Sequence, residues 1–467
     1  MSRARLRQAL DSLLGDPEFG NAHWGVLIVD PTSGDTLYAR NADKLFLPAS
    51  NMKLVTAAVA LATLGHDFTF TTPFVAGGTV HGDTLHGTLY VAGSGDPTLS
   101  PHFHEADAMN AMRAVADSLR AHGVTHITGG IAPAGDPLPW PPWGYGWSWE
   151  DLREGYGAGV DELFFNEGAF KLAVTGSPVP GAAPTVSRTP DIGYPEVIVR
   201  AITVEPPRDT LHTPELVVVP DFARGALTIT GTIAARSTEV LDAPFPDQTA
   251  AFLAALRTAL AERGVTVEGT QAPAPLTDTL FVLRSPTLAE LLPAMQKPSQ
   301  NQIAELLLRT VARVRTGIGT ADSAQRIVDS TLVAWGVDST GFVIRDGSGV
   351  SRYDYLSPRT LVTVLARMWG DSAYYDALPI AGVDGTLAAR MHGTPAWGNA
   401  HAKTGFVSNA RSLSGYVTSR DGHHLVFSLL ANNWTAPRRD VERVQDAIVA
   451  LLASLELGAT RDAGAAP

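Results

Sequence analysis

The segment LPASNMKLVTAAVALATLG (residues 47–65) decides the fold and raises the first question about function. Beyond Ser50 it predicts an almost wholly apolar helix that ends at Gly65, a residue favoured just past helix ends. Lys53 lies at the start of this apolar stretch, three residues after Ser50. On a helix, that spacing places both side chains on one face, roughly 5–6 Å apart at Cβ. A lysine beside a serine in a segment predicted to be buried requires an explanation.

Two explanations fit this pair. A serine hydroxyl is a weak nucleophile until a base removes its proton. Lys53 can be that base if burial or a second cation lowers its pKa from about 10.4. Alternatively, Ser50 caps the helix and Lys53 extends its ammonium group to solvent. A bare Ser-x-x-Lys arises by chance about once or twice in a chain of this length. The pair alone therefore leaves both explanations open.

Composition narrows the class of protein. A chain of 467 residues favours two or three domains, and 45% hydrophobic with 18% charged residues is ordinary for a globular protein. The net charge of −12 and the lack of a basic stripe argue against a nucleic-acid partner. With no cysteine, disulfides, thiol catalysis and Cys-ligated metals are excluded. No stretch reaches the ~20 apolar residues of a membrane helix, so no transmembrane anchor is predicted.

The order of predicted elements indicates one domain built from both chain ends. Residues 23–40 read as two strands, and residues 411–419 and 423–433 as two more, joined by an Asp-Gly turn typical of hairpins. From about 73 to 245, short β-like runs alternate with Gly and Pro clusters. Helical patterns return after about 285. We therefore expect an α/β domain that carries a β-rich insertion.

Two further motifs decide between the two explanations. KPSQNQIAELLLR (297–309) places Ser299 and Asn301 before an amphipathic helix, and NAHAKTGFVSNARSLSGY (399–416) places Lys403-Thr404-Gly405 at the start of a predicted strand. Taken singly, the first is a helix cap and the second a strand end. In the order Ser-x-x-Lys, Ser-x-Asn, Lys-Thr-Gly they match the motif set of penicillin-recognising serine acyl-transferases. A second lysine facing Lys53 would also depress its pKa.

The resemblance extends to the family of three-domain, low-molecular-mass class C penicillin-binding proteins, which are D-alanyl-D-alanine carboxypeptidases and endopeptidases. It covers about residues 20–450, and 246 positions separate Lys53 from Ser299, room for two inserted domains. Four further segments resemble the family in order: GSGDPTLS (93–100), WSWEDLREGYGAGVDELFFNEG (147–168), RDGSGVSRYDYLSP (345–358) and LPIAGVDGTL (378–387).

The resemblance implies an α/β fold. A penicillin-recognising DD-peptidase/β-lactamase-like domain, with an antiparallel sheet flanked by helices and a helical lobe, would carry two nested, β-rich inserted domains. We expect the catalytic domain over residues 1–72 and 285–467 and inserted domain II over 73–168 and 245–284. Inserted domain III, nested in domain II, is expected over 169–244.

The resemblance also implies roles for the first two motifs. Ser50 would be the acylated nucleophile and Lys53 its general base. Ser299 would relay a proton to the departing D-alanine amine. Asn301 would hydrogen-bond both Lys53 and the carbonyl side of the substrate peptide.

For the third motif, the resemblance implies that Lys403 and Thr404 hold the terminal carboxylate. Gly405 and Phe406 would border the substrate, and the backbone N–H groups of Ser50 and Phe406 would form the oxyanion hole. Phe406 departs from the family, which usually has Thr there. Because the backbone N–H suffices, we expect catalysis to survive and substrate shape preference to change.

Other departures concern specificity. Gln300 stands where the family has Asp or Asn, and its side chain is expected to point away from the reacting atoms. Trp140 and Arg352 are predicted to border the substrate pocket. Some relatives carry an acidic residue in the Trp/Pro loop, but this chain has none between Trp140 and Trp149, which favours an uncharged side-chain pocket.

The predicted function is therefore a serine D-alanyl-D-alanine carboxypeptidase that cleaves peptidoglycan stem peptides and is acylated by β-lactams, and the resemblance also allows DD-endopeptidase activity. No cofactor or metal is expected. The alternatives are a weak β-lactam-hydrolysing or esterase relative, or a non-catalytic cell-wall-binding module of the same fold. The family's substrate lies outside the cytoplasmic membrane, so an extracytoplasmic protein is expected, with its leader peptide not present in this sequence.

Overall fold

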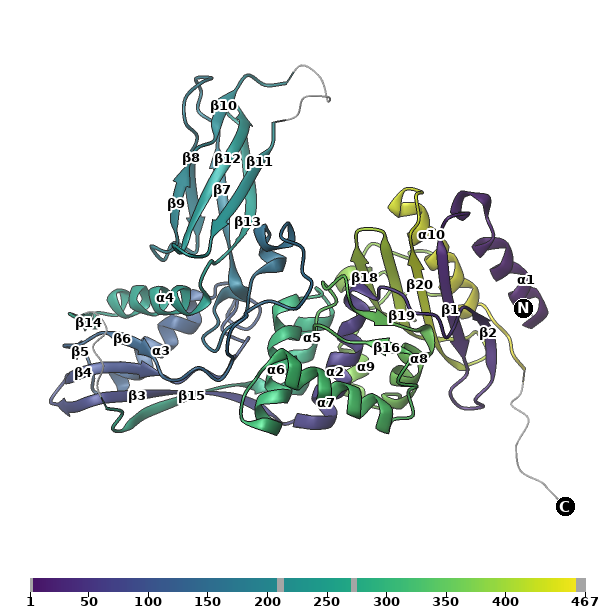
Figure 1. The fold of residues 1–467 in the computed structure, drawn as a ribbon, viewed down its shortest axis with the longest axis horizontal. Coiled ribbons are helices and arrows are strands. Elements are labelled where there is room, and N and C mark those ends of the chain that lie inside the picture. The colour runs from purple at the N-terminus through teal and green to yellow at the C-terminus, as the bar shows by residue number, and fades with distance from the viewer. Residues whose placement is uncertain (1–2, 208–213, 270–274, 459–467) are drawn as a thin grey trace.

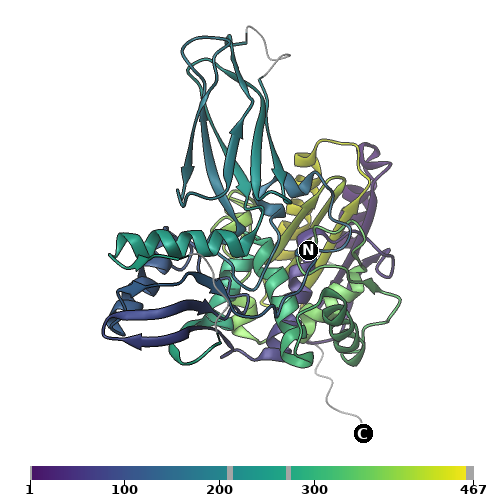
Figure 2. The ribbon, with the colours of Figure 1, turned by 60° about the vertical axis from the view of Figure 1, so that its left-hand side comes forward.

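A computed structural model describes residues 3–207, 214–269 and 275–458. The chain forms three bodies (Figure 1). The two chain ends build a five-stranded sheet with helices on both faces, a second body holds a six-stranded sheet with two helices, and a third stands away from it as a pair of small sheets. Figure 2 shows the same separation from another side.

The central sheet joins the N- and C-terminal parts of the chain. Its order is β18-β19-β20-β1-β2, all antiparallel, and Val26 of β1 pairs with Leu429 of β20. Helices α1 and α10 cover one face, while α2 and α8 cover the other (Figure 1). The bounds are β1 His23–Val29, β2 Thr36–Arg40, β18 His401–Val407, β19 Ala410–Thr418, β20 His424–Asn432, α1 Arg3–Leu14 and α10 Arg438–Ala453.

A helical lobe packs on the face of the sheet opposite α1 and α10. Its centre is α2, whose residues from Met52 to Leu61 are all buried. Because other elements cover the helix on every side, it can be apolar on every side. Around it lie α5 Leu288–Gln296, α6 Asn301–Thr316, α7 Ala321–Ala334, α8 Pro358–Arg367 and α9 Ser372–Asp376, with α2 spanning Met52–Leu64 and the short strands β16 Phe342–Val343 and β17 Tyr355–Leu356.

The first insertion leaves and rejoins the lobe through one strand pair. Strands β3 and β15 run antiparallel, with Thr69 opposite Thr287, so the outgoing and returning chains support each other. The sheet order is β14-β5-β4-β3-β15, with β6 beside β4, and α3 packs against α4 over it. The bounds are β3 Thr69–His81, β4 Thr84–Val91, β5 His126–Ile127, β6 Ile131–Pro133, β14 Thr266–Val267, β15 Thr279–Thr287, α3 Met109–Ala121 and α4 Gln248–Glu262.

The second insertion is joined to the first in the same way, through one pair of antiparallel strands. Strands β7 and β13 pair antiparallel, with Ala169 opposite Pro244, and together with the five described strands between them they form the two small sheets. These strand pairs lie at the predicted junctions, although the domain limits themselves stay a prediction. The bounds are β7 Ala169–Thr175, β8 Thr185–Thr189, β9 Glu196–Val199, β10 Ile202–Val204, β11 Leu216–Asp221, β12 Ala226–Ala234 and β13 Thr238–Pro244.

Short 3₁₀ helices connect these elements, and three of them, η2, η4 and η6, contribute residues to the site described below. They are η1 Pro17–Phe19, η2 Ala49–Asn51, η3 Asp151–Arg153, η4 Gly155–Gly157, η5 Asn166–Gly168 and η6 Gly385–Leu387. Within the described ranges, no helix is both long and apolar enough to cross a membrane.

Candidate active site

Ser50 lies in η2, directly before α2, and does not cap it. Asn51 occupies the N-cap position and makes no side-chain cap hydrogen bond. Ala49 has a positive φ of 47°, a left-handed conformation that costs an alanine energy and places Ser50 on a sharp turn. Lys53 is fully buried, with 0% of its side chain exposed. The structural alternative, a capping serine and a solvated lysine, is therefore wrong.

The Lys53 ammonium group is enclosed by three oxygen acceptors. Its Nζ lies 2.9 Å from Ser50 Oγ, 2.7 Å from Asn301 Oδ1 and 2.8 Å from the carbonyl oxygen of Ser348. Three donors and three acceptors satisfy the charged form completely. When Lys53 gives up a proton, its lone pair can face Ser50 Oγ, while Asn301 and Ser348 still accept from the remaining N–H groups. The geometry therefore suits proton removal from Ser50.

Burial lowers the pKa of Lys53 to about 7, although the charges of Asp346 and Glu305 act in the opposite direction. Burial has this effect because the low-dielectric interior disfavours the charged ammonium. The sequence argument gave part of this role to Lys403. In the structure, burial is the main cause of a lowered pKa of Lys403 itself. The charges of Lys53 and Arg411 lower that pKa further. The charges of Asp346 and Glu305 favour the protonated form of Lys53 and so prevent burial from lowering its pKa further.

The second motif stands opposite Ser50. Ser299 Oγ accepts a hydrogen bond of 2.8 Å from Lys403 Nζ. Ser299 has a positive φ of 67°, and α6 begins two residues later at Asn301. The amide nitrogen of Asn301 donates to the backbone carbonyl of Tyr156, 2.9 Å away, which ties the motif to inserted domain II. Asn301 thus touches Lys53 as expected, whereas its contact with a substrate carbonyl stays a prediction.

The third motif forms β18 at the edge of the central sheet. Asn51 donates a 2.8 Å hydrogen bond to the carbonyl of Lys403, and Ser412 donates a 2.6 Å bond to that of Pro48. These bonds hold the turn around Ser50 against β18 and β19. A Cβ atom at Gly405 would lie 2.9 Å from the Ser50 nitrogen and 2.1 Å from Ser412 Oγ. Only glycine permits this approach, which sets β18 beside the Ser50 N–H.

The side chain of Phe406 packs outside this contact. Its ring is 45% exposed and lies under two guanidinium groups, with Arg411 Cζ at 5.6 Å and Arg438 Cζ at 5.1 Å from the ring centroid. Such cation–π contacts fix the ring's position. The ring of Phe406 thus lies outside the contact between β18 and Ser50.

The sequence argument missed Thr386 as a site residue. Thr404 Oγ1 lies 2.7 Å from Thr386 Oγ1, to which it donates. The same loop is tied to the second motif, because Thr386 N donates to the carbonyl of Lys297 and the Lys297 ammonium pairs with Asp384 at 2.5 Å. The loop that carries Thr386 therefore contacts both the second and the third motif. The only sequence signal was the segment 378–387, which resembles the family but whose position in space was unknown.

A buried acidic cluster supports the site from behind and was also missed. Glu305 accepts hydrogen bonds from the backbone N–H groups of Gly347 and Ser348, at 2.9 and 2.8 Å, which aims the Ser348 carbonyl at Lys53. Trp147 donates to Asp346 at 2.8 Å, connecting the Trp/Pro loop to the same segment. Burial raises the pKa of Glu305 from its ordinary value.

The two predicted pocket residues lie in different surroundings. Arg352 donates to the carbonyl of Ser408, 3.0 Å away, in the turn between β18 and β19. Trp140 is 76% exposed and contacts Trp143, which in turn contacts Phe222 of inserted domain III. The structure brings Arg352 to the strand that carries the third motif and does not bring Trp140 there. A substrate contact by either residue stays a prediction.

A group of carboxylates elsewhere has metal-like geometry. The ligand atoms of Asp136, Asp161 and Glu162 lie within 4.8 Å of one another. Burial, a hydrogen bond with Asp161 and the charge of Asp161 raise the pKa of Glu162 to about 9. The raised pKa favours the protonated form of Glu162 beside Asp161.

The comparison with known families agrees with this geometry. The sequence profile of the D-Ala-D-Ala carboxypeptidase 3 (S13) family matches residues 6–455. The chain belongs to this family. Its sequence is 34% identical over 469 residues to a D-alanyl-D-alanine carboxypeptidase of Actinomadura sp., covering 96% of this chain and 84% of that protein. It is 26% identical to the carboxypeptidase DacB of Haemophilus influenzae, covering 85% of this chain and 82% of that protein.

Solved structures show the same fold. The crystal structure of penicillin binding protein 4 from Haemophilus influenzae superposes with a TM-score of 0.84 at 23% identity, covering 96% of this chain and 99% of that one. The same protein complexed with a β-lactam gives 0.79 at 22% identity, again covering 96% and 99%. The predicted fold class and the predicted activity, a serine-type D-Ala-D-Ala carboxypeptidase, are confirmed.

The pKa of Lys53 predicts a pH dependence. A general base acts in its neutral form, so the second-order rate of acylation by benzylpenicillin should fall about tenfold per pH unit below about 7 and level off above it. Stopped-flow measurements between pH 5.5 and 9 check this. Lys53→Arg, which stays charged throughout, should show no acylation. A rise centred near pH 10 would contradict the lowered pKa.

Gly405→Ala tests the approach of β18 to Ser50. The added Cβ displaces the strand, so one backbone donor to the developing oxyanion is misplaced, and acylation should slow by about 100-fold or more. Gly20→Ala, in an open turn where the nearest atom would be 3.3 Å away, is the matched control and should retain the wild-type rate. Equal acylation rates in the two variants would show that β18 does not contribute to the oxyanion hole.

Thr386→Val tests the hydroxyl beside Thr404. Without it, the Thr404 hydroxyl loses an acceptor and turns away from the substrate, and KM for an acyl-D-Ala-D-Ala peptide should rise up to about tenfold, the worth of one neutral hydrogen bond. Thr386→Ser should restore the wild-type KM. A purely structural role would instead lower the melting temperature and leave KM unchanged.

Proposed function

We propose that this protein releases D-alanine from peptidoglycan stem peptides through an acyl-enzyme on Ser50. The observation that carries the proposal is the 2.9 Å contact between Ser50 Oγ and the buried Nζ of Lys53. Neutral Lys53 takes the Ser50 proton as Oγ attacks the carbonyl of the penultimate D-alanine. The N–H groups of Ser50 and Phe406 bind the oxyanion that forms.

The remaining residues complete the reaction. Ser299, in contact with Lys403, gives its hydroxyl proton to the departing amine as the peptide bond breaks, and takes in return the proton that Lys53 removed from Ser50. Lys403 and Thr404 bind the terminal carboxylate, helped by Thr386. A water molecule, deprotonated by Lys53, then attacks the ester and frees Ser50. Asn301 orients Lys53 through both steps.

Two further parts of the proposal follow from this substrate. β-Lactams mimic the terminal D-Ala-D-Ala and would acylate Ser50, forming a slowly hydrolysed ester. Stem peptides lie outside the cytoplasmic membrane, so the protein is proposed to act there. The family match over residues 6–455 and the chain's similarity to named carboxypeptidases support both parts.

Intact mass after incubation with benzylpenicillin tests the nucleophile. Wild type should gain one penicillin mass on the peptide containing Ser50, and Ser50→Ala should gain none. D-Alanine release from an acyl-D-Ala-D-Ala peptide, assayed alongside, should fall at least about 10⁴-fold in the same variant, as when a catalytic serine is removed. Rapid penicillin turnover with no D-alanine release would favour a β-lactam-hydrolysing enzyme, and neither adduct nor turnover would favour a wall-binding module.

A further inference from the structure

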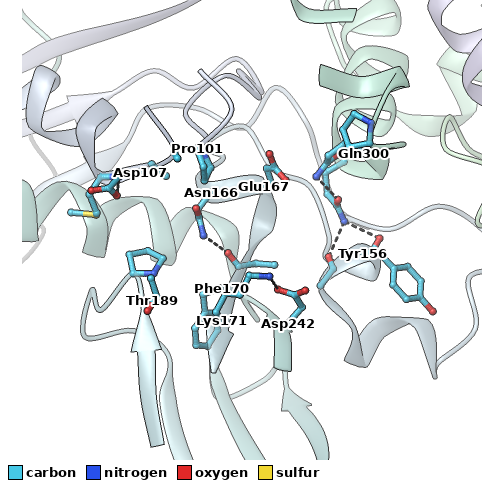
Figure 3. Close-up of a pocket in the computed structure, with 18 of the residues that line it drawn as sticks. Pro101, Asp107, Tyr156, Asn166, Glu167, Phe170, Lys171, Thr189, Asp242 and Gln300 are labelled. Carbon is cyan, nitrogen blue, oxygen red and sulfur yellow. Dashed lines mark hydrogen bonds and ion pairs between the residues drawn. The ribbon is translucent and has the colours of Figure 1, made fainter. Parts of the chain in front are cut away.

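A large cavity opens beside the second motif. Its volume is about 1080 Å³, and the catalytic domain contributes only residues 298–302 to its wall (Figure 3). All its other lining residues come from the inserted domains, between positions 101 and 262. A volume near 1,000 Å³ is at the upper end of the range for drug-sized ligands. Released D-alanine alone is far smaller, so the cavity has room for a longer leaving group.

The cavity wall is predominantly acidic. It carries six carboxylates and two cations: Asp107, Glu154, Glu167, Asp191, Asp242 and Glu262, with Arg113 and Lys171. Both cations are already engaged. Lys171 pairs with Asp242 at 2.6 Å, and Arg113 with Asp107 and Glu262, each at 2.8 Å. Within the described parts of the chain, Glu154 and Glu167 form no salt bridge. The unneutralised charge of the cavity is therefore negative.

Glu167 is held in place by unusual backbone geometry. Asn166 and Glu167 have φ angles of 52° and 58°, and both precede Gly168 at 78°. Left-handed conformations are costly for a residue such as glutamate, and they persist where the surroundings impose them. Figure 3 shows the Glu167 side chain on the cavity wall next to Gln300. Gln300 lies between Ser299 and Asn301, so Glu167 reaches the catalytic loop.

Two hydrogen bonds hold the Gln300 side chain in its place beside Glu167. Its side-chain oxygen accepts from Ile303 N at 2.9 Å as the N-cap of α6, and its amide donates to Gln302 at 2.9 Å. Glu154 lies on the same wall, directly before η4. Tyr156, within η4, accepts the hydrogen bond from Asn301 at its backbone carbonyl. The two glutamates therefore flank the catalytic loop on the side of the cavity.

The surroundings of both glutamates disfavour the charged form of their carboxylates. Burial raises the pKa of Glu167, and burial together with the charge of Asp242 raises that of Glu154. A carboxylate in this state gains from a cationic ligand, because the ligand offsets both the burial and the repulsion. The cavity lies on the leaving-group side, since Ser299 contacts Lys403, which is proposed to bind the terminal carboxylate.

We propose that this cavity is a leaving-group subsite for a departing D-residue with a long cationic side chain, whose ammonium group Glu154 and Glu167 bind. This inference rests on the proposed function. Two kinds of leaving group share the chemistry that this subsite requires, an ammonium group several bonds beyond the scissile amide. A single basic D-residue supplies it, and so does the diamino residue of a peptide cross-link that keeps a free ammonium group.

The experiment compares three substrates with one acyl half and different leaving residues: N-acyl-D-alanyl-D-alanine, the D-lysine analogue and the D-norleucine analogue. Norleucine matches most of the length of lysine without its charge. Wild type should have a kcat/KM for D-lysine release about tenfold above that for D-norleucine, the effect of a modest charge-assisted contact. Glu154→Gln/Glu167→Gln should remove this preference, and each single variant should reduce it.

The controls separate this inference from the proposed function. Glu239→Gln, an exposed glutamate on β13 outside the cavity wall, removes the same charge and should keep the preference. D-Alanine release should stay within about twofold in Glu239→Gln, and an unchanged melting temperature in all variants shows that they are folded. Equal release of D-lysine and D-norleucine by wild type, or a preference that survives the double substitution, would overturn the subsite. No D-alanine release by wild type would instead overturn the proposed function.

A cross-linked peptide dimer with a free ammonium group on its leaving half distinguishes the two sources. If the double variant loses cleavage of the dimer together with its D-lysine preference, the subsite binds cross-linked peptides. If only the D-lysine preference is lost, the subsite binds single basic residues.

Discussion

The site depends on one interaction, the burial of the Lys53 ammonium group among three oxygens. Ser50, Asn301 and Ser348 supply these acceptors from three distant parts of the chain. Burial favours the neutral base, while the acceptors and the nearby carboxylates Asp346 and Glu305 favour the cation. The balance leaves a lysine with a pKa of about 7. A lysine in water would be almost wholly protonated at that pH and could not take a proton from serine.

The rest of the fold keeps these groups together. The apolar helix α2 buries Lys53, the strand pair β1 and β20 closes the domain from both chain ends, and Gly405 lets β18 approach the Ser50 nitrogen. The inserted domains also contribute, since the carbonyl of Tyr156 fixes the Asn301 side chain. Two paired strands carry each insertion, so the insertions extend from the catalytic domain without interrupting its sheet.

Much of this was accessible from sequence because it is local. The helix after Ser50, its end at Gly65 and the last hairpin follow from periodicity and turn residues. The order of three short motifs indicated the family and the chemistry. The sequence argument failed where contacts depend on distance in space. It missed Thr386 and Glu305, and it could not show that, of Trp140 and Arg352, only Arg352 reaches the turn after β18.

The class of reaction and a set of candidate reacting groups came from the sequence, because residue type and spacing indicate a nucleophile, a base and an anion-binding strand. Tertiary structure alone decided how those groups behave. The pKa of Lys53 depends on burial, which no local pattern measures, and the acidic cavity beside Ser299 is assembled from segments far apart in the chain. Electrostatic effects of this kind act through space at a few ångströms, so they appear only when the chain is folded.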